Sequence, residues 1–257
     1  MNWLRQTEEP LFPDILWGRP ENKRHAGKLL IIGGHKQSFN AVSAAFSAAL
    51  KAGIGDARVI LPDKLQKTVS QLFAEVEYAP SNEIGSFSRQ ALATLLDAAS
   101  WADGVLLAGD FGRNSETSIL LESFVSRYIG KLAATGDSLD YFLNQPSTIA
   151  QRENTLVITS LSQAQKLASP DLLQQKADFI KVIEQIQQWV SKTKMCAVTV
   201  QSNQIIVACG RQISATAFKT AISDENLAAY SAVWFLQQPA KPFEAVTTAA
   251  YESAKRT

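Results

Sequence analysis

Residues 27–62 read GKLLIIGGHKQSFNAVSAAFSAALKAGIGDARVILP, and this stretch decides the fold class. Its first part, KLLII at 28–32, is a short apolar run that ends at Gly33-Gly34, which predicts a buried strand followed by a tight turn. Residues 39–52 are rich in alanine, carry apolar residues at helical spacing and stop at Gly53, which predicts a helix. RVIL at 58–61 then predicts a second strand. A strand, a helix and a strand joined by short loops are typical of a parallel sheet.

The same alternation continues to the end of the chain. Further strands are predicted at 75–78, 104–107, 131–134, 155–158, 195–200 and 205–208. Helices are predicted from Asp63 onward and at 88–100, 115–129, 164–168, 171–190, 224–237 and 243–254. The last two strands flank Ser202-Asn203-Gln204, which indicates a hairpin of antiparallel edge strands. We therefore expect a three-layer α/β/α architecture with a mostly parallel sheet and a C-terminal antiparallel hairpin.

Length and composition favour one domain that binds neither nucleic acid nor membrane. No linker divides the 257 residues, so we expect an N-terminal lead-in at 1–20, with room for one short helix, and an α/β domain at 21–257. The formal net charge is +1, so no broad attraction to nucleic acid is expected. No apolar run approaches the roughly 20 residues of a membrane span. The first ten residues lack the apolar core of a signal peptide, so we expect a cytoplasmic protein.

Cysteine and histidine are scarce. Cys196 and Cys209 form neither a CxxC motif nor a disulfide framework, so we expect two small buried apolar residues in a reducing compartment. His25 and His35 are the only histidines of the sequence, and we predict no metal site.

The distribution of glycine points to the first half of the chain as the ligand side. Twelve of the 13 glycines lie at or before Gly136, and only Gly210 follows. Ligands of parallel α/β sheets usually bind outside the carboxyl ends of the strands. This rule selects the loops 33–40, 108–114, 135–140 and 159–163 and the turn before residue 224.

Several of these loops carry motifs of one family. The segment 27–62, with Gly33, Gly34, Ala41 and the helix end Ala52-Gly53-Ile54-Gly55, resembles the opening of the ADP/ATP-dependent NAD(P)H-hydrate dehydratases. ADGVLLAGDFGRNSET at 102–117 is similar to the G-P-G-L-G loop of that family, with Gly109 and Gly112 as its outer glycines. TGDSLDYF at 135–142 resembles the family's V-L-D-A-D-A-L, with Asp137 as the first aspartate, and the tail FEAVTTAAYESAKR resembles its final helix.

The resemblance implies a ribokinase-like fold and the repair of hydrated nicotinamide cofactors. ADP or ATP with Mg²⁺ would phosphorylate the hydrate, NADHX or NADPHX, and loss of phosphate would restore the cofactor, which is a lyase activity. Members of the family often assemble as homo-oligomers. Substrate binding would fall on four residues: Ala41, Gly109, Gly112 and Asp137. The anion hole G-S-G-D or G-T-G-D would fall on Ile222-Ser223-Asp224-Glu225, with Ser223 and Asp224 at the nucleotide and Glu225, or Asp224, as the general base.

The sequence departs from the family at this anion hole. Ile222 and Asp224 replace its two glycines, so side chains occupy positions where backbone must approach a phosphate. Ser223 could instead cap the next helix, while Asp224 and Glu225 complement its dipole.

Other family positions differ as well. Thr159-Ser160-Leu161 stands where the family has T-P-H, Ala197-Val198-Thr199-Val200 stands where it has a lysine–glycine pair, and Asp110 replaces a proline. Asp137 has two interpretations, a ligand-facing carboxylate or a cap on the turn 138–142. Asp103 and Asp110 have the same two interpretations, as a ligand-facing carboxylate or as a cap on a turn.

The residues leave three functions open. The first is a dehydratase that tolerates Glu225 as its base, and the second is a catalytically inactive relative that acts as a binding or scaffold protein. The third is a kinase for another small alcohol, which the missing G-x-G-D disfavours because such a kinase needs the same anion hole.

Overall fold

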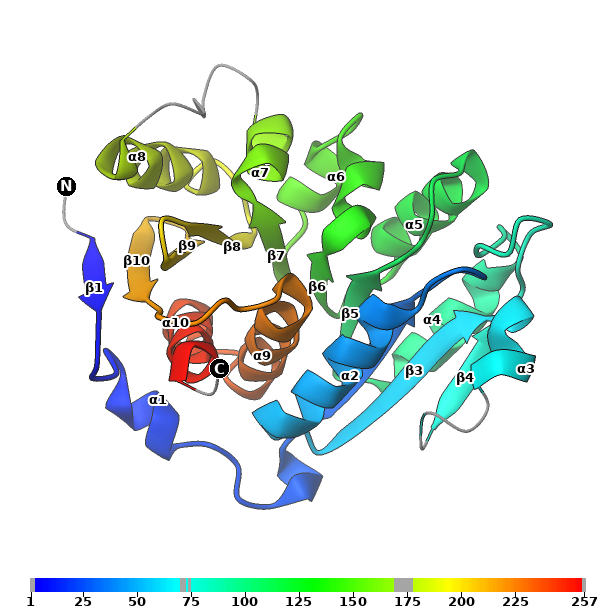
Figure 1. Ribbon diagram of the computed structural model, residues 1–257, viewed down its shortest axis with the longest axis horizontal. Coiled ribbons are helices and arrows are strands. Elements are labelled where there is room, and N and C mark those ends of the chain that lie inside the picture. Colours follow the sequence, from blue (N-terminus) through cyan, green and yellow to red (C-terminus); the bar gives the residue numbers. More distant parts are fainter. Residues whose placement is uncertain (1–2, 70–72, 74, 169–177, 256–257) are drawn as a thin grey trace.

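A computed structural model describes residues 3–69, 73, 75–168 and 178–255 of the chain (Figure 1). Its centre is a ten-stranded sheet in the order β1-β10-β9-β8-β7-β6-β5-β2-β3-β4. The strands are β1 (Leu4–Gln6), β2 (Lys28–Gly33), β3 (Asp56–Pro62), β4 (Val76–Ala79), β5 (Gly104–Gly109), β6 (Lys131–Thr135), β7 (Thr155–Ser160), β8 (Cys196–Gln201), β9 (Gln204–Cys209) and β10 (Gln212–Ala217). Of these, β9 alone runs against its neighbours, and every other pairing is parallel.

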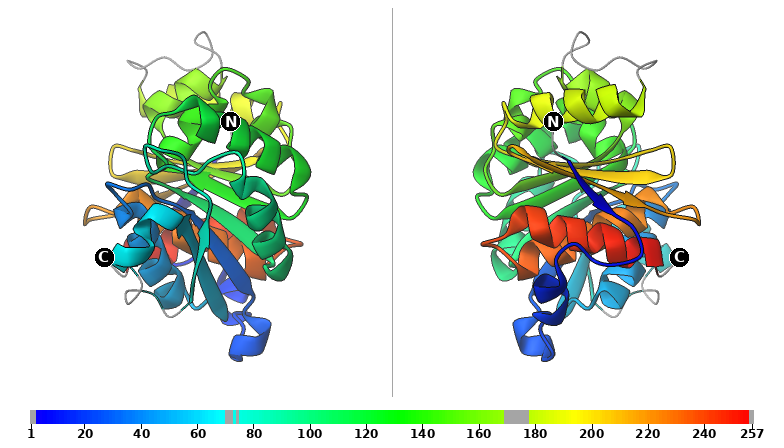
Figure 2. Two further views of the ribbon diagram at one scale, coloured as in Figure 1. Left: turned by 90° about the vertical axis from the view of Figure 1, so that its right-hand side faces the viewer. Right: turned by 90° about the vertical axis from the view of Figure 1, so that its left-hand side faces the viewer.

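Helices cover both faces of the sheet. One layer contains α1 (Pro13–Trp17), α2 (Asn40–Ala52), α3 (Gln66–Val69), α9 (Asp224–Gln237) and α10 (Pro242–Lys255), whose apolar residues share one core. The other contains α4 (Ala91–Trp101), α5 (Ser115–Arg127), α6 (Ser147–Ala150), α7 (Leu161–Ala168) and α8 (Phe179–Val190), around a second core. Figure 2 shows the two layers on either side of the strands. The predicted three-layer α/β/α fold is confirmed.

Strand residues alternate between the two cores. Leu29 and Ile31 of β2 belong to the core under α2 and α9, whereas Leu30 and Ile32 belong to the core under the opposite layer. This alternation is the period of two of an extended strand that is buried on both faces. Ten consecutive residues of α9, 227–236, are buried, because this helix packs between α2, α10 and the centre of the sheet.

The N-terminal segment is part of the sheet. Leu4–Gln6 pairs in parallel with β10, and the right-hand view of Figure 2 shows this segment lying against the hairpin region and α10. The buried Gln6 side chain donates to Thr216 Oγ1 and to the Thr247 carbonyl, each at 2.9 Å. The short helix expected in the lead-in is α1. The predicted hairpin therefore does not form the edge of the sheet, because β10 and β1 lie beyond it.

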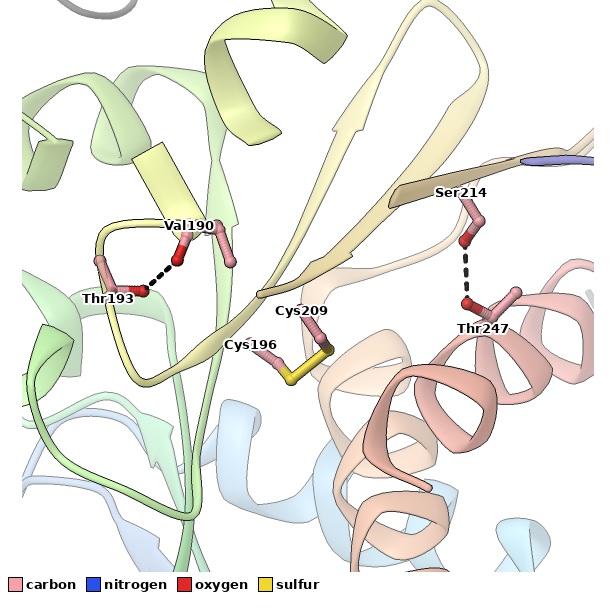
Figure 3. The surroundings of a disulfide bond; sticks show 6 residues. All are labelled: Val190, Thr193, Cys196, Cys209, Ser214 and Thr247. Atoms are coloured by element: carbon pink, nitrogen blue, oxygen red, sulfur yellow. Dashed lines mark hydrogen bonds between the residues drawn. A yellow bond between two sulfur atoms is a disulfide. The ribbon is translucent and has the colours of Figure 1, made fainter. Parts of the chain in front are cut away.

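Both cysteines are buried as expected, but the prediction that they form no disulfide was wrong. Cys196 and Cys209 are joined by a disulfide between β8 and β9, on the sheet face that contacts α9 and α10 (Figure 3). The turn residues Ser202 and Asn203 both have positive φ, and the two cysteines lie equally far from this turn on facing strands. A tight two-residue turn fixes the register of a hairpin, so the turn places both cysteines on one rung.

The remaining sequence predictions differ mainly at the ends of elements. Helix α8 begins at Phe179, and residues 171–177 of the predicted helix lie outside the described residues. Strand β10 was not predicted. In the part of the chain that the structure describes, no helix is long and apolar enough to cross a membrane.

Candidate functional site

Helix α9 orients the candidate site. Near its end, the carbonyl of Leu236 accepts a hydrogen bond at 3.0 Å from Nζ of Lys131, the first residue of β6. Gln237 Nε2 donates at 3.0 Å to the carbonyl of Ala26, just before β2. The end of α9 therefore lies at the amino edge of the sheet, and its first turn, with Asp224 and Glu225, lies at the carboxyl edge. Ligands of this type of sheet bind at that edge.

The loops after β2 and β5 touch at this carboxyl edge. The Gly34 N–H donates to the Gly109 carbonyl at 3.0 Å. A Cβ on Gly33 would lie 2.4 Å from the same carbonyl oxygen, so only glycine fits at position 33. Gly34 and Gly109 both have positive φ. The glycine pattern of the sequence thus reflects a close approach of two backbone segments.

Asp110 links these loops to α2. Helix α2 starts after Phe39, which has no side-chain acceptor for a cap. The Asp110 carboxylate supplies one, because its Oδ2 accepts the Ala41 N–H at 2.9 Å. The Asp110 carbonyl lies 2.8 Å from His35 Nδ1, and the residue has a φ of 60°. Asp110 therefore places a negative charge at the positive end of the α2 dipole.

Asp137 binds the loop after β5. Its two carboxylate oxygens accept the N–H groups of Phe111 and Gly112, each at 3.2 Å. Burial raises the pKa of Asp137 above its ordinary value, those two hydrogen bonds lower it, and the carboxylates of Asp110 and Asp140 raise it. The Asp137 carboxylate thus stabilises the conformation of the loop after β5.

The four residues expected at the substrate lie together. A Cβ on Gly109 would lie 3.5 Å from Asp137 Oδ1 and 3.6 Å from the Ala41 Cβ, and Gly112 donates to Asp137. Asp103 lies elsewhere, since its carboxylate accepts the Lys28 N–H at the amino edge of the sheet.

A hollow of about 310 Å³ adjoins this cluster, and we call it the Asp137 pocket. It is lined by Gly112, Arg113, Asn114, Ser118, Asp137, Asp140, Tyr141, Leu143, Asn144 and Lys166. Sequence reasoning missed its cations, Arg113 from the loop before α5 and Lys166 from α7, because no local motif joins them. Burial raises the pKa of Tyr141 to about 12, so this hydroxyl stays protonated at neutral pH.

The first turn of α9 is arranged differently from an anion hole. Ser223 Oγ accepts the Asn226 N–H at 3.2 Å, so the interpretation of Ser223 as a helix cap is confirmed. Ile222 packs against the core that α2, α9 and α10 share. Partial burial, with the Glu225 carboxylate as a second cause, raises the pKa of Asp224. None of residues 222–225 lines the Asp137 pocket, so the predicted site residues fall into two groups.

In the described part of the chain, no group of three or more His, Cys, Asp or Glu side chains could hold a metal ion.

Comparison with known proteins supports the fold. No protein-family model matches the sequence, and no curated protein matches it either. Among solved structures, a ribokinase-like superfamily protein from Enterococcus faecalis is similar, with a TM-score of 0.74 and 16% identity over 98% of this chain and 86% of that one. A hypothetical protein from Streptococcus mutans has a TM-score of 0.72 and 16% identity over 92% of this chain and 84% of that one.

Enzymes of the resembled family are also among these structures. The ADP/ATP-dependent NAD(P)H-hydrate dehydratase from Bacillus subtilis, co-crystallised with ATP and Mg²⁺, has a TM-score of 0.61 and 13% identity over 91% of this chain and 81% of that one. The chain therefore has a ribokinase-like fold that resembles carbohydrate-kinase-like and hydrate-dehydratase structures.

Proposed function

We propose that this chain is a small-molecule-binding relative of the NAD(P)H-hydrate dehydratases that does not transfer phosphate. The observation that carries the proposal is the first turn of α9, where a phosphate cradle would lie. Ile222 packs into the core there, Ser223 caps the helix, and Asp224 and Glu225 hold two carboxylates.

These residues do not fit a nucleotide phosphate. Backbone N–H groups hold phosphate closely only where no side chain intervenes, which is the role of glycine in such loops. Two like charges about 4 Å apart repel by about 1 kcal/mol in water and by several times more in a partly dry site. Asp224 and Glu225 would each exert this repulsion on a phosphate. We therefore infer that the chain does not transfer phosphate from ADP or ATP.

Asp110 provides a second argument of the same kind. Its carboxylate accepts the Ala41 N–H in the first turn of α2, another helix that begins at the carboxyl edge. A ligand anion at that turn would have to displace an internal carboxylate, at a cost in hydrogen bonding and repulsion. The N-termini of α2 and α9 are thus both occupied by the protein's own side chains.

The residues expected at the substrate follow the resembled motifs more closely than the residues expected at the phosphate. Ala41, Gly109, Gly112 and Asp137 lie together, and the Asp137 pocket opens beside them. A pocket with polar walls at the carboxyl edge of a parallel sheet is where a small molecule is expected. This supports retained binding without phosphoryl transfer.

A second candidate is an ADP/ATP-dependent NAD(P)H-hydrate dehydratase that acts on NADHX or NADPHX. The raised pKa of Asp224 favours it, because a general base works best with a pKa nearer the operating pH. Asp224 or Glu225 would then accept the substrate proton.

An activity assay distinguishes the two. The purified chain is incubated with NADHX, Mg²⁺ and either ADP or ATP, and the absorbance of reduced nicotinamide is followed, with the Bacillus subtilis dehydratase as positive control. We expect no recovery of NADH and no micromolar binding of ADP or ATP by calorimetry. Turnover that Glu225→Ala or Asp224→Ala abolishes would establish the enzyme instead.

A further inference from the structure

The Asp137 pocket contains acidic and basic side chains, and the acidic ones have more interaction partners within the protein than the basic ones do. Its acids have partners within the protein. Both oxygens of Asp137 accept backbone N–H groups, and Asp140 Oδ1 accepts a hydrogen bond from Gln163 Nε2 at 3.1 Å. Gln163 also donates to the Gly136 carbonyl at 3.0 Å, so its amide is held in place. Hydrogen bonds within the protein thus hold both carboxylates in position.

Among the described residues, the cations of the pocket have no ion-pair partner. Arg113 and Lys166 both line the hollow, and neither forms an ion pair with any residue that the structure describes. They come from different elements, the loop before α5 and the last turn of α7. Two positive charges on two sides of the pocket therefore have no ion-pair partner among the described residues and can pair with an anionic ligand.

Neutral hydrogen-bonding groups lie beside these cations. Ser118 and Asn144 line the same hollow. The Ser118 hydroxyl donates to Glu122 Oε1 at 3.3 Å, which leaves its oxygen free to accept a hydrogen bond. Hydroxyl groups of a ligand are suited to such partners.

The size of the pocket limits the ligand. About 310 Å³ is at the small end of the roughly 300–1,000 Å³ typical of small-molecule pockets. A dinucleotide such as NADHX would extend well beyond these walls, whereas a single sugar with one charged group would fit.

We propose that the Asp137 pocket binds a compact anionic sugar derivative, with its phosphate or carboxylate between Arg113 and Lys166 and its hydroxyl groups toward Ser118 and Asn144. This inference rests on the proposed binding function and names its ligand class. It differs from the dinucleotide that the resemblance implies.

Titration calorimetry of the purified chain tests the inference. The probes are ribose 5-phosphate and gluconate, which distinguish phosphate from carboxylate, with neutral ribose, inorganic phosphate, NAD⁺ and ATP for comparison. We expect one of the two anionic sugars to bind more tightly than neutral ribose and than NAD⁺, and its affinity to fall as salt is added. Arg113→Ala and Lys166→Ala should each weaken that binding at least about tenfold, because each removes a charge-assisted hydrogen bond to the ligand's anionic group.

Control variants distinguish binding in the pocket from nonspecific attraction of anions to positive charges on the surface. Arg127→Ala removes an exposed arginine at the other end of α5, and Lys192→Ala removes an exposed lysine beyond α8, so both should leave binding unchanged. The inference is overturned if neither anionic sugar binds, if binding survives both pocket variants, or if NAD⁺ or ATP binds more tightly. The dehydratase assay is separate, so an inactive chain that binds no anionic sugar would refute only this inference.

Discussion

The carboxylate of Asp110 caps helix α2 from another loop: its Oδ2 accepts the N–H of Ala41 at 2.9 Å, across 69 residues of sequence. Asp110 has a φ of 60°, a region that aspartate and asparagine tolerate better than most residues. Proline, which the resembled G-P-G-L-G motif would place at this position, is fixed near −65° and could not adopt this backbone. A proline at position 110 would therefore be incompatible with the conformation of this loop.

Asp110→Ala should lower the free energy of unfolding by about 2 kcal/mol, from a lost helix cap and an unfavourable φ. Asp110→Asn keeps an acceptor and tolerates this φ, so it should stay within about 0.5 kcal/mol of the wild type. Urea unfolding measures both. Equal losses in the two variants would show that the hydrogen bond to Ala41 does not stabilise the fold.

The pKa of Asp137 predicts a pH dependence. Because the folded-state pKa lies above the ordinary value of 3.8, the folded protein binds more protons than the unfolded chain between those two values. This group's contribution to stability is therefore present below pH 3.8 and is lost as the pH rises through the raised pKa. Asp137→Asn should be less stable overall, since an amide cannot accept both N–H groups, but should lose this part of the slope.

Urea unfolding of the wild type and of Asp137→Asn at a series of pH values above 3.8 gives the difference directly. If stability instead rises through this range because of Asp137, its two hydrogen bonds outweigh its burial, and the pKa of this carboxyl is lowered rather than raised.

Rebuilding the phosphate cradle tests whether the first turn of α9 excludes a nucleotide. The triple substitution Ile222→Gly, Asp224→Gly and Glu225→Asp restores Gly-Ser-Gly-Asp and removes one carboxylate. We expect ATP affinity, measured by calorimetry with Mg²⁺, to rise at least about tenfold, equivalent to about 1.4 kcal/mol. The melting temperature should fall, because Ile222 packs against the core and two glycines are added at the helix start. Ile222→Ala serves as the control for lost packing. If ATP affinity does not increase, residues other than 222–225 prevent nucleotide binding.

The disulfide between Cys196 and Cys209 should stabilise the hairpin. Their separation of 13 residues closes a loop for which chain entropy predicts about 3 kcal/mol. A reductant should lower the urea midpoint of the wild type and leave Cys196→Ala/Cys209→Ala unchanged. Mass spectrometry of unreduced peptides detects the bond itself. Identical midpoints with and without reductant would show that it contributes nothing.

Local signals in the sequence predicted most of the fold. Apolar runs that end in glycine predicted β2 and β5, and the alanine-rich stretch predicted α2. The meeting of the loops after β2, β5 and β6 also followed from the strand alternation. Partners that are distant in sequence did not follow, such as Asp110 with Ala41, or Arg113 with Lys166 in one pocket. The sequence around an aspartate does not indicate which distant loop its carboxylate will contact.

The disulfide is a different case. The sequence predicts a turn of three residues, Ser202-Asn203-Gln204, whereas the turn in the structure is Ser202-Asn203, from which both cysteines lie equally far. The register of the hairpin was not predicted, since a turn of three residues would have offset the cysteines by one position and turned them to opposite faces.

Strand β1 was missed because three residues are too few for a periodic signal, and Gln6 shows what holds it. The side chain is buried, donates to Thr216 Oγ1 and the Thr247 carbonyl, and accepts the Leu11 N–H at 2.8 Å. Gln6→Leu keeps a similar volume but leaves these groups without partners. We expect a loss of about 2–3 kcal/mol in the free energy of unfolding.

Hydrogen exchange separates a local effect of Gln6→Leu from a global one. In the variant, the amides of β1 and β10 should exchange faster while those of β2 and β5 keep their protection, because the edge strand detaches before the centre opens. Thr7→Ala, at the exposed neighbouring position, should change neither stability nor exchange. Unchanged protection of β10 in Gln6→Leu would mean that the pairing of β1 with β10 does not depend on this side chain.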